Sequence, residues 1–285
     1  STPEDRAKRF GQLGAMFGLG FILGPVAGGL LGEIDLRLPF VVAGVLALAN
    51  LVYGYFVLPE SLAAHNRRSV GWSAANPFAA LLTLARTPGL GALTATIALT
   101  GLAQFTLYSS WVLYTTYKFG WGPGINGWAL FLVGLVSALG QGFLMARLLK
   151  KMPARRLVLM ALASTGVAYL GWGLAPVGWV MFVVISLNVL GAMTMSTLQS
   201  LVSSATPASE QGRTLGAVSG LASAMAVLGP IVGGVAMHAV AGLPAGDVRI
   251  GLPFFVCSAL AFGAVAVACI HLRRTASASA AAAAT

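Results

Sequence analysis

Eight stretches of this chain are apolar over lengths typical of membrane proteins. They lie at about 10–32, 38–58, 89–117, 124–148, 157–175, 177–202, 214–240 and 252–271. A hydrocarbon core about 30 Å thick is crossed by about 20 apolar residues in a helix. The runs do not alternate in polarity, so they predict spanning helices rather than the strands of a barrel. The sequence therefore predicts an all-α integral membrane protein with eight spans, surrounded by lipid.

The few charges of the chain are distributed unevenly between the predicted loops. Charged residues make up 8% of the chain, and the formal net charge is +10. If the first segment is cytoplasmic and the sides alternate, the outside holds only Arg37, Lys118 and Arg249. Lys and Arg favour the cytoplasmic side, so both termini are predicted to be cytoplasmic, and the basic charge requires no nucleic-acid partner. The inside holds Arg6, Lys8, Arg9, Arg67, Arg68, Arg86, Arg147, Lys150, Lys151, Arg155, Arg156, Arg213, Arg273 and Arg274.

One motif, Gly-Pro-x-x-Gly-Gly, occurs twice within these runs, in residues 20–29 and 228–234. Small residues at such spacings let a neighbouring backbone approach closely in lipid, and proline bends a helix by removing one hydrogen bond. Generic small-residue packing accounts for one copy, but it accounts poorly for two copies in the same register. The expected packing residues are Gly20, Gly24, Pro25, Gly28, Gly29, Gly229, Pro230, Gly233 and Gly234.

Further paired landmarks indicate an internal duplication. Pro25 and Pro230 are 205 positions apart, and the helix starts at Thr2-Pro3 and Thr206-Pro207 are 204 apart. A third pair, Asp-x-Arg followed by Pro-Phe, occurs in residues 35–40 and 247–254. Six predicted spans separate the copies, which is the parallel repeat of major facilitator transporters. On this interpretation four spans, on the order of 115 residues, precede the chain.

The duplication predicts the domain boundaries. Residues 1–58 are expected to hold the last two helices of a first six-helix half, and residues 59–88 the cytoplasmic linker between halves. Residues 89–272 are expected to form the second six-helix half. The Ala/Ser-rich residues 273–285 contain nothing bulky to bury, so they are predicted to be a disordered cytoplasmic tail.

Motif and topology together resemble the drug-exporting antiporters of the major facilitator superfamily, in which Gly-Pro-x-x-Gly-Gly is the antiporter motif of the fifth span. The chain is most similar to the tetracycline-resistance exporters, for example at residues 59–61, 111–114, 119–121 and 198–199. Thr165 stands where those exporters carry an aspartate. The resemblance implies spans five to twelve of a major facilitator fold, export of drug-like compounds in exchange for protons, and a monomer in a bacterial inner membrane.

The chemistry that the residues can perform points to binding rather than catalysis. No Asp or Glu occurs between Glu60 and Glu210, so a proton-carrying carboxylate is expected in the absent spans. Amide, hydroxyl and aromatic side chains at helical spacing predict a neutral cavity for a small amphipathic solute, although they could equally bond one helix to another. The cavity candidates are Gln104, Tyr108, Trp111, Ser137, Gln141, Asn188, Met195 and Gln199.

Other function classes find little support in the sequence. The three histidines and the two cysteines, Cys257 and Cys269, are not spaced as metal ligands or as a nucleophile–base pair. We therefore expect no metal, no cofactor and no enzymatic activity. Two alternatives to an exporter remain open: a facilitator or symporter of a small solute, and a truncated membrane fragment that does not transport.

Overall fold

The computed structural model describes residues 19–20, 22–57, 91–206 and 211–283, and the regular structure in these ranges is helical. An apolar helix covers Ile22–Ile34 and is followed by α2. The labelled elements are α2 (Leu38–Val57), α4 (Gly91–Phe119), α5 (Pro123–Leu139), the π-helix η3 (Gly140–Leu144), α6 (Met145–Lys151), α7 (Ala154–Leu174), α8 (Gly178–Leu187), the 3₁₀-helix η4 (Gly191–Met193), α9 (Thr194–Ser204), α10 (Gln211–Ala239), the 3₁₀-helix η5 (Val248–Gly251) and α11 (Leu252–Ala283).

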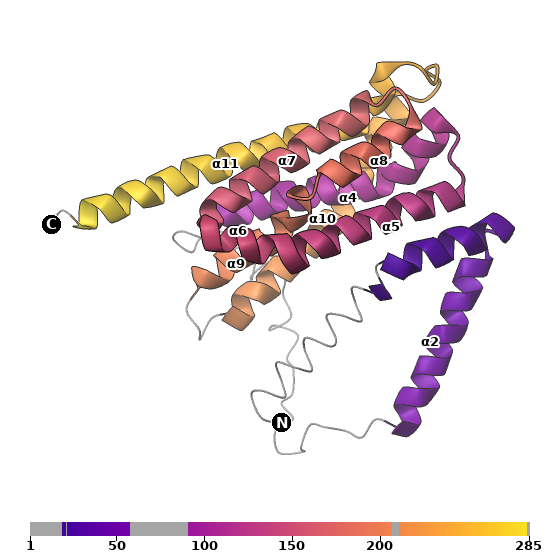
Figure 1. Cartoon of the computed structure of the whole chain (residues 1–285), viewed down its shortest axis with the longest axis horizontal. Coiled ribbons are helices and arrows are strands. Elements are labelled where there is room, and N and C mark those ends of the chain that lie inside the picture. The colour runs from indigo at the N-terminus through magenta and orange to yellow at the C-terminus, as the bar shows by residue number, and fades with distance from the viewer. Residues whose placement is uncertain (1–18, 21, 58–90, 207–210, 284–285) are drawn as a thin grey trace.

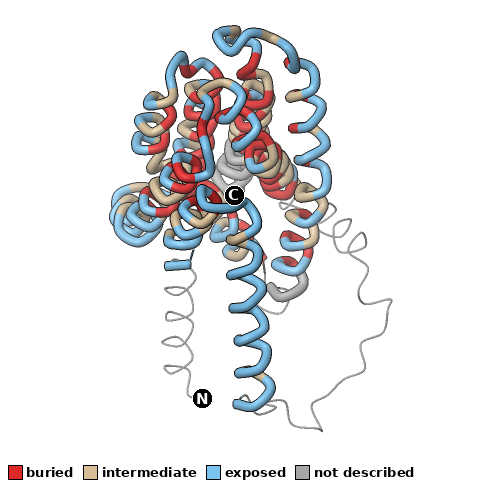
Figure 2. The backbone as a smooth tube through the Cα atoms, turned by 90° about the vertical axis from the view of Figure 1, so that its right-hand side faces the viewer, coloured by how far each residue is buried: buried red, intermediate tan, exposed pale blue. Residues whose placement is uncertain are grey.

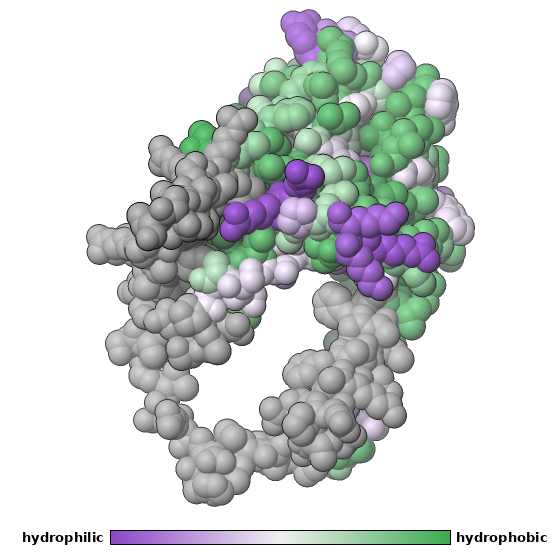
Figure 3. Space-filling view, turned by 60° about the vertical axis from the view of Figure 1, so that its left-hand side comes forward, coloured by the Kyte–Doolittle hydropathy of each residue, from purple (hydrophilic) through white to green (hydrophobic). Residues whose placement is uncertain are grey.

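The helices from α4 to α11 form one bundle, in which α4 packs against both α10 and α11 and α11 also packs against α7 (Figure 1). Buried residues face the middle of this bundle, whereas α2 lies apart from it with no buried residue (Figure 2). On the face in Figure 3, the described residues are largely hydrophobic, and the hydrophilic ones among them gather in a few patches. Such an outer surface suits lipid on its sides and water at its ends.

Two hydrophobic clusters hold the bundle together. One is aromatic and contains Trp111, Tyr114, Trp172 and Phe254, which come from α4, α7 and α11. The other is aliphatic, built around residues such as Leu162 and Leu198. Aromatic rings meet edge to face at 4.5 Å between the Tyr114 and Phe254 centroids, a geometry that contributes beyond simple burial.

The structure gives fewer clear spans than the eight predicted. Within the described residues, five helices are long and apolar enough to cross a membrane, or six if the bent pair α8 and α9 is one span. The predicted spans at 38–58, 124–148, 157–175, 214–240 and 252–271 correspond to such helices. The helix Ile22–Ile34 is shorter, and α4 is not among the five. The count of eight therefore remains a prediction.

The composition of α4 explains why it differs from the other long helices. It has 29 residues but is rich in threonine, and several of its hydroxyls donate back to the preceding turn. Thr96 Oγ1 bonds the Ala92 carbonyl at 2.9 Å, and Thr100 Oγ1 bonds the Thr96 carbonyl at 2.8 Å. Each of these hydroxyls is satisfied by a backbone carbonyl of the same helix. The threonine-rich helix can therefore be buried among other helices.

The loops assigned to one side of the membrane gather at one end of the molecule. The turn before α2, the α4–α5 connection and the η5 loop lie at one end in Figure 1, and the α6–α7 turn lies at the other. This arrangement agrees with the alternation of sides inferred from the Lys and Arg distribution. The predicted linker at 59–88 and the helix starts at Thr2-Pro3 and Pro207 lie outside the described residues.

The third paired landmark adopts the same turn twice. The Arg37 amide donates to Asp35 Oδ1 at 2.7 Å, and the Arg249 amide donates to Asp247 Oδ1 at 2.8 Å. An Asp side chain that bonds the backbone two residues on forms an Asx-turn. Each turn precedes a helix that begins near a Pro-Phe pair, so the sequence likeness extends to local structure.

The backbone at the C-terminus differs from its sequence prediction. Residues 273–283, expected to be disordered, continue α11 as helix to Ala283. Alanine has the highest helix propensity, and extending an existing helix avoids the cost of nucleation. Figure 1 shows this end of α11 projecting beyond the bundle.

Candidate functional site

The first copy of the repeated motif packs its backbone directly against α5. A methyl group added to Gly29 would lie 2.9 Å from the Pro123 carbonyl oxygen and 3.0 Å from Gly127 Cα. A methyl added to Gly127 would lie 2.6 Å from the Pro25 carbonyl oxygen. Only hydrogen fits on either side, so the two glycines allow these helices to touch without an intervening side chain.

The second copy packs in the same manner against α4. Space for a methyl at Gly229 is taken by Phe105 and Thr106, and space at Gly233 by the hydroxyls of Ser109 and Ser110. Thr106 Oγ1 also donates to the Gly229 carbonyl at 3.3 Å. Pro230 lies within the continuous helix α10. Both copies therefore place glycines at close helix–helix contacts.

The two copies nevertheless use different glycines. In the first, Gly20, Gly24 and Gly28 have no described atom near the methyl position, and Gly29 makes the contact. In the second, Gly229 and Gly233 make the contact, and Gly234 has no neighbour among the described residues. Each motif thus has two packing faces, of which the described residues fill one.

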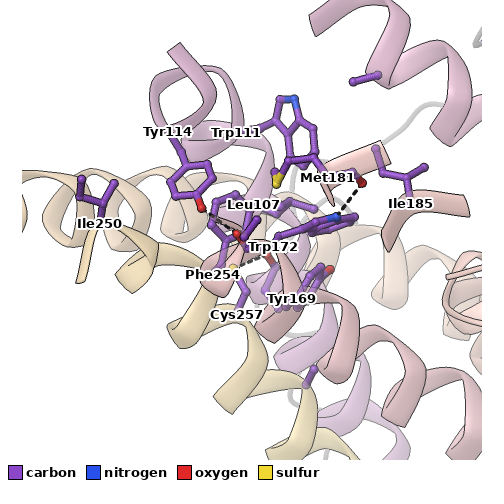
Figure 4. Packing of buried hydrophobic residues seen from close by; sticks show 14 of the residues in the cluster. Leu107, Trp111, Tyr114, Tyr169, Trp172, Met181, Ile185, Ile250, Phe254 and Cys257 are labelled. Carbon is purple, nitrogen blue, oxygen red and sulfur yellow. Dashed lines mark hydrogen bonds between the residues drawn. The ribbon is translucent and has the colours of Figure 1, made fainter. Parts of the chain in front are cut away.

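The cavity candidates on α4 do not share one environment. Gln104 is half-buried and Tyr108 is 56% exposed, whereas Trp111 is 5% exposed and belongs to the aromatic cluster. The Trp111 ring stands edge-on to Trp172 with centroids 5.3 Å apart (Figure 4). Its indole nitrogen is buried without a hydrogen-bond partner among the described residues. Trp111 is thus a core residue here, because the aromatic cluster encloses this part of α4.

The predicted face of Asn188, Met195 and Gln199 is interrupted. The chain bends by 58° between α8 and the segment Gly191–Ser204, which comprises η4 and α9, and Asn188 lies directly after α8. Helical spacing therefore does not carry across the break. Asn188 Oδ1 accepts from Ser164 Oγ of α7 at 2.9 Å. Met195 is half-buried and Gln199 is exposed. Asn188 therefore bonds helix to helix, the alternative that the sequence left open.

A second irregularity lies beside this break. The π-helix η3 follows α5, and a methyl on Gly140 would lie 3.1 Å from the Val189 carbonyl oxygen. Within η3, Gln141 Oε1 accepts from Ser196 Oγ of α9 at 2.6 Å. Ser137 is half-buried at the end of α5. π-Helices are frequent at functional sites, and non-helical backbone at membrane depth is tolerated where it is buried or lines a cavity.

Further polar residues at this junction were not predicted as site residues. Ser164 and Ser196 bond Asn188 and Gln141, and the hydroxyls of two buried threonines, Thr165 and Thr194, lie 3.2 Å apart. The signal in the sequence is a set of nearby glycines, because glycine weakens a helix interior; they are Gly140, Gly142 and Gly191.

The described residues contain no group of three or more His, Cys, Asp or Glu that could hold a metal.

Comparison with known proteins identifies the family to which this architecture belongs. The profile of the Major Facilitator Superfamily matches residues 1–230 and, in a second placement, residues 93–284. The chain belongs to the major facilitator superfamily. It is a multi-pass membrane protein related to transporters, and two overlapping placements of one profile are what an internal repeat produces.

The relatives of this major facilitator protein include bacterial and eukaryotic proteins. It is 31% identical to the class C tetracycline resistance protein of Escherichia coli over 80% of this chain and 58% of that one. It is 30% identical to the class G protein of Vibrio anguillarum, over 81% of this chain and 59% of that one. The human Hippocampus abundant transcript 1 protein is 24% identical, over 81% of this chain and 48% of that one. The chain thus spans less than two thirds of the length of these curated relatives.

A solved structure supports the fold. The human organic anion transporter MFSD10 (TETRAN) superposes with a TM-score of 0.61 at 24% sequence identity, covering 88% of this chain and 61% of that chain. At this identity the likeness concerns the arrangement of helices. It agrees with the all-helical membrane fold expected from the apolar runs.

Proposed function

We propose that this protein is part of a secondary active transporter that exports small amphipathic compounds in exchange for protons across a bacterial inner membrane. The observation that carries the proposal is the backbone contact between Gly29 and Gly127. It joins the helix Ile22–Ile34 to α5. The predicted repeat assigns these two helices to opposite six-helix halves. Transporters of this architecture work by rocking one half against the other, and smooth glycine contacts permit such movement.

The substrate surface is proposed to be neutral and mixed in polarity. Gln104 and Tyr108 present an amide and a phenol ring on an incompletely buried part of α4. Gln141 and Ser196 present a second polar pair at an exposed position. A solute with an apolar body and a few hydrogen-bonding groups suits these side chains. The names of the tetracycline-resistance relatives support drug-like compounds as the class.

Exchange for protons requires a titrating group at membrane depth, usually a carboxylate. The sequence has no Asp or Glu between Glu60 and Glu210. The proposal therefore places the coupling carboxylate in helices that the repeat predicts before Ser1. It also keeps residues 1–58 as the last two helices of the first six-helix half and residues 89–272 as the second half.

The experiment is export from cells that express the complete gene. Cells should grow at higher concentrations of some amphipathic drugs than cells with an empty vector. Everted membrane vesicles should take up the active compound when a pH gradient is imposed, and uptake should stop when an ionophore removes the gradient. Uptake without dependence on the gradient would favour a facilitator, and no uptake of any compound would contradict transport.

Variants on α4 test the substrate surface. Gln104→Leu and Tyr108→Ala should raise the KM for the exported compound about tenfold, the loss of about 1.4 kcal/mol of binding. Trp179→Ala changes an aromatic residue that is 67% exposed on α8 and is the matched control. An unchanged KM in both α4 variants would remove this surface from the proposed site.

A further inference from the structure

The outer end of the glycine contact carries a carboxylate. Glu33 is an exposed residue near the end of the helix Ile22–Ile34, and its carboxylate lies against Gly124 in the first turn of α5. A methyl on Gly124 would overlap the Glu33 carboxylate, and Gly124 is itself buried. Glu33 thus reaches the neighbouring helix beyond the contact of Gly29 with Gly127.

The start of α5 lacks the usual side-chain cap. Its N-cap is Gly122, which makes no side-chain hydrogen bond, and Pro123 opens the helix. The first backbone amides of a helix have no partner inside it, and together they carry a partial positive charge. A carboxylate held over Gly124 is therefore attracted to this end of α5.

No charged side chain on α5 competes with this attraction. Residues Pro123–Leu139 contain no ionisable side chain. On the segment that follows Glu33, Asp35 accepts the backbone amide of Arg37. Lys118, at the end of α4, donates to the Tyr114 hydroxyl at 3.2 Å and to the Gly173 carbonyl at 3.5 Å. Among the described residues, Glu33 forms no salt bridge with Arg37 or Lys118, and its observed contact is with the start of α5.

The second copy of the repeat lacks this feature. The offset that relates Pro25 to Pro230 places Gly29 opposite Gly234 and Glu33 opposite His238. Gly234 has no described neighbour at its methyl position, and His238 is exposed. The carboxylate therefore accompanies the contact of the first copy with α5, and the matching position of the second copy holds a histidine.

We propose that Glu33 is a charge latch: its ionised carboxylate, set on the uncapped start of α5, holds the outer ends of the two halves together. The partner of Glu33 is the set of backbone amides at the start of α5. Separation of the two halves therefore leaves no unpaired charged side chain on α5. Its consequence for transport rests on the proposed function, but the contact itself does not.

Cross-linking tests the latch without any transport measurement. A Cβ on Gly32 would lie 3.2 Å from Pro123 Cβ, a few tenths of an ångström below the about 3.5–4.5 Å of a disulfide. In the complete protein with Cys257 and Cys269 replaced by Ala, the pair Gly32→Cys and Pro123→Cys should form a disulfide on mild oxidation in membranes. Adding Glu33→Gln should lower the yield of the cross-link about two- to fivefold at low salt.

The controls separate charge from shape. Glu33→Lys should lower the yield further, because it places a positive charge on a positive helix end. Asp35→Asn removes another outer carboxylate two residues away and should leave the yield unchanged. Raising the salt concentration should narrow the difference in yield between the protein that keeps Glu33 and its Glu33→Gln variant, because exposed charges are screened. Equal yields with Glu33 and Glu33→Gln, or an equal loss in Asp35→Asn, would overturn the latch.

A second measurement avoids the cysteine pair in the packed contact. Spin labels at the exposed positions Leu36 and Ile125 report the separation of the two outer ends. Glu33→Gln should shift part of the distance distribution to longer values, and Asp35→Asn should not. If the distribution is the same with and without the Glu33 charge, the latch is wrong even where the glycine contact and transport are intact.

Discussion

Adjacent glycines in this protein have different surroundings. Gly28 has no described atom near its methyl position, whereas Gly29 meets the backbone of α5. At Gly28 the main consequence of a side chain is conformational, since alanine favours helix over glycine by about 1 kcal/mol. At Gly29 the added methyl also strains a packed contact, which costs about 1–3 kcal/mol.

These effects have opposite signs, and they lead to a paired prediction. Gly28→Ala should leave the thermal unfolding midpoint of the purified protein unchanged or raise it. Gly29→Ala should lower the midpoint, because about 1–3 kcal/mol of strain outweighs the gain in helix propensity. If both substitutions shift the midpoint equally, the contact with α5 does not contribute to stability.

The Asx-turn at Asp247 gives a prediction for pH. The side chain of Arg249 donates to Asp247, with 2.7 Å between Nη2 and Oδ2, and the Arg249 amide donates as well. These bonds lower the pKa of Asp247 below its usual 3.8. A lowered folded-state pKa stabilises the turn above the unfolded value, and this stabilisation is lost as pH falls through the folded value.

We therefore expect the Asp247 carboxylate to titrate below pH 3.8 in an NMR titration of the detergent-solubilised protein. Arg249→Ala should move the titration midpoint upward, because the largest cause of the shift is the Arg249 side chain. A midpoint that is the same in both proteins would contradict the pairing.

At the scale of helices, a few hydrogen bonds fix how α4 lies in the bundle. Tyr114 Oη donates to the Trp172 carbonyl of α7 at 2.7 Å in a buried position, and Tyr117 Oη donates to the Leu243 carbonyl at 2.7 Å in an exposed one. The bonds have the same length and the same chemistry. They differ in whether water can replace the lost donor.

Removing each hydroxyl should therefore have unequal effects. Tyr114→Phe should lower the free energy of unfolding by about 1 kcal/mol. Tyr117→Phe should change it little, because water can bond the Leu243 carbonyl. Denaturant unfolding followed by tryptophan fluorescence would measure both, and an equal loss in the two variants would contradict the role given to burial.

The sequence predicted helices better than it predicted where they break. Long apolar runs placed most helix bodies, because hydrophobic length is a strong signal in lipid. The break after Leu187 and the π-helix at Gly140–Leu144 were missed, since neither contains proline. Both lie where α5 and η3 pack against α8 and η4, a contact between segments that are distant in the sequence. The candidate faces through Asn188 and Gln141 assumed an unbroken helix, so these positions were identified as polar but their partners were not.

At the scale of the whole molecule, the alternation of loops makes a prediction for topology. A single cysteine at Ala245, in the exposed loop before η5, should react with an impermeant thiol reagent added outside intact cells. A single cysteine at Lys150, at the end of α6, should react only after the membrane is permeabilised. Cys257 and Cys269 are replaced by Ala in both. Labelling of both positions from the same side would contradict the assigned orientation.

The paired glycines have a consequence for how related sequences diverge. Gly29 and Gly127 each occupy the space that a side chain on the other helix would need. A larger residue at one position can be accepted only after α5 has moved away, and that movement would also remove the reason for glycine at the other. Across homologues the two alignment columns should therefore change together, which makes the pair a marker for lineages that keep this spacing between helices.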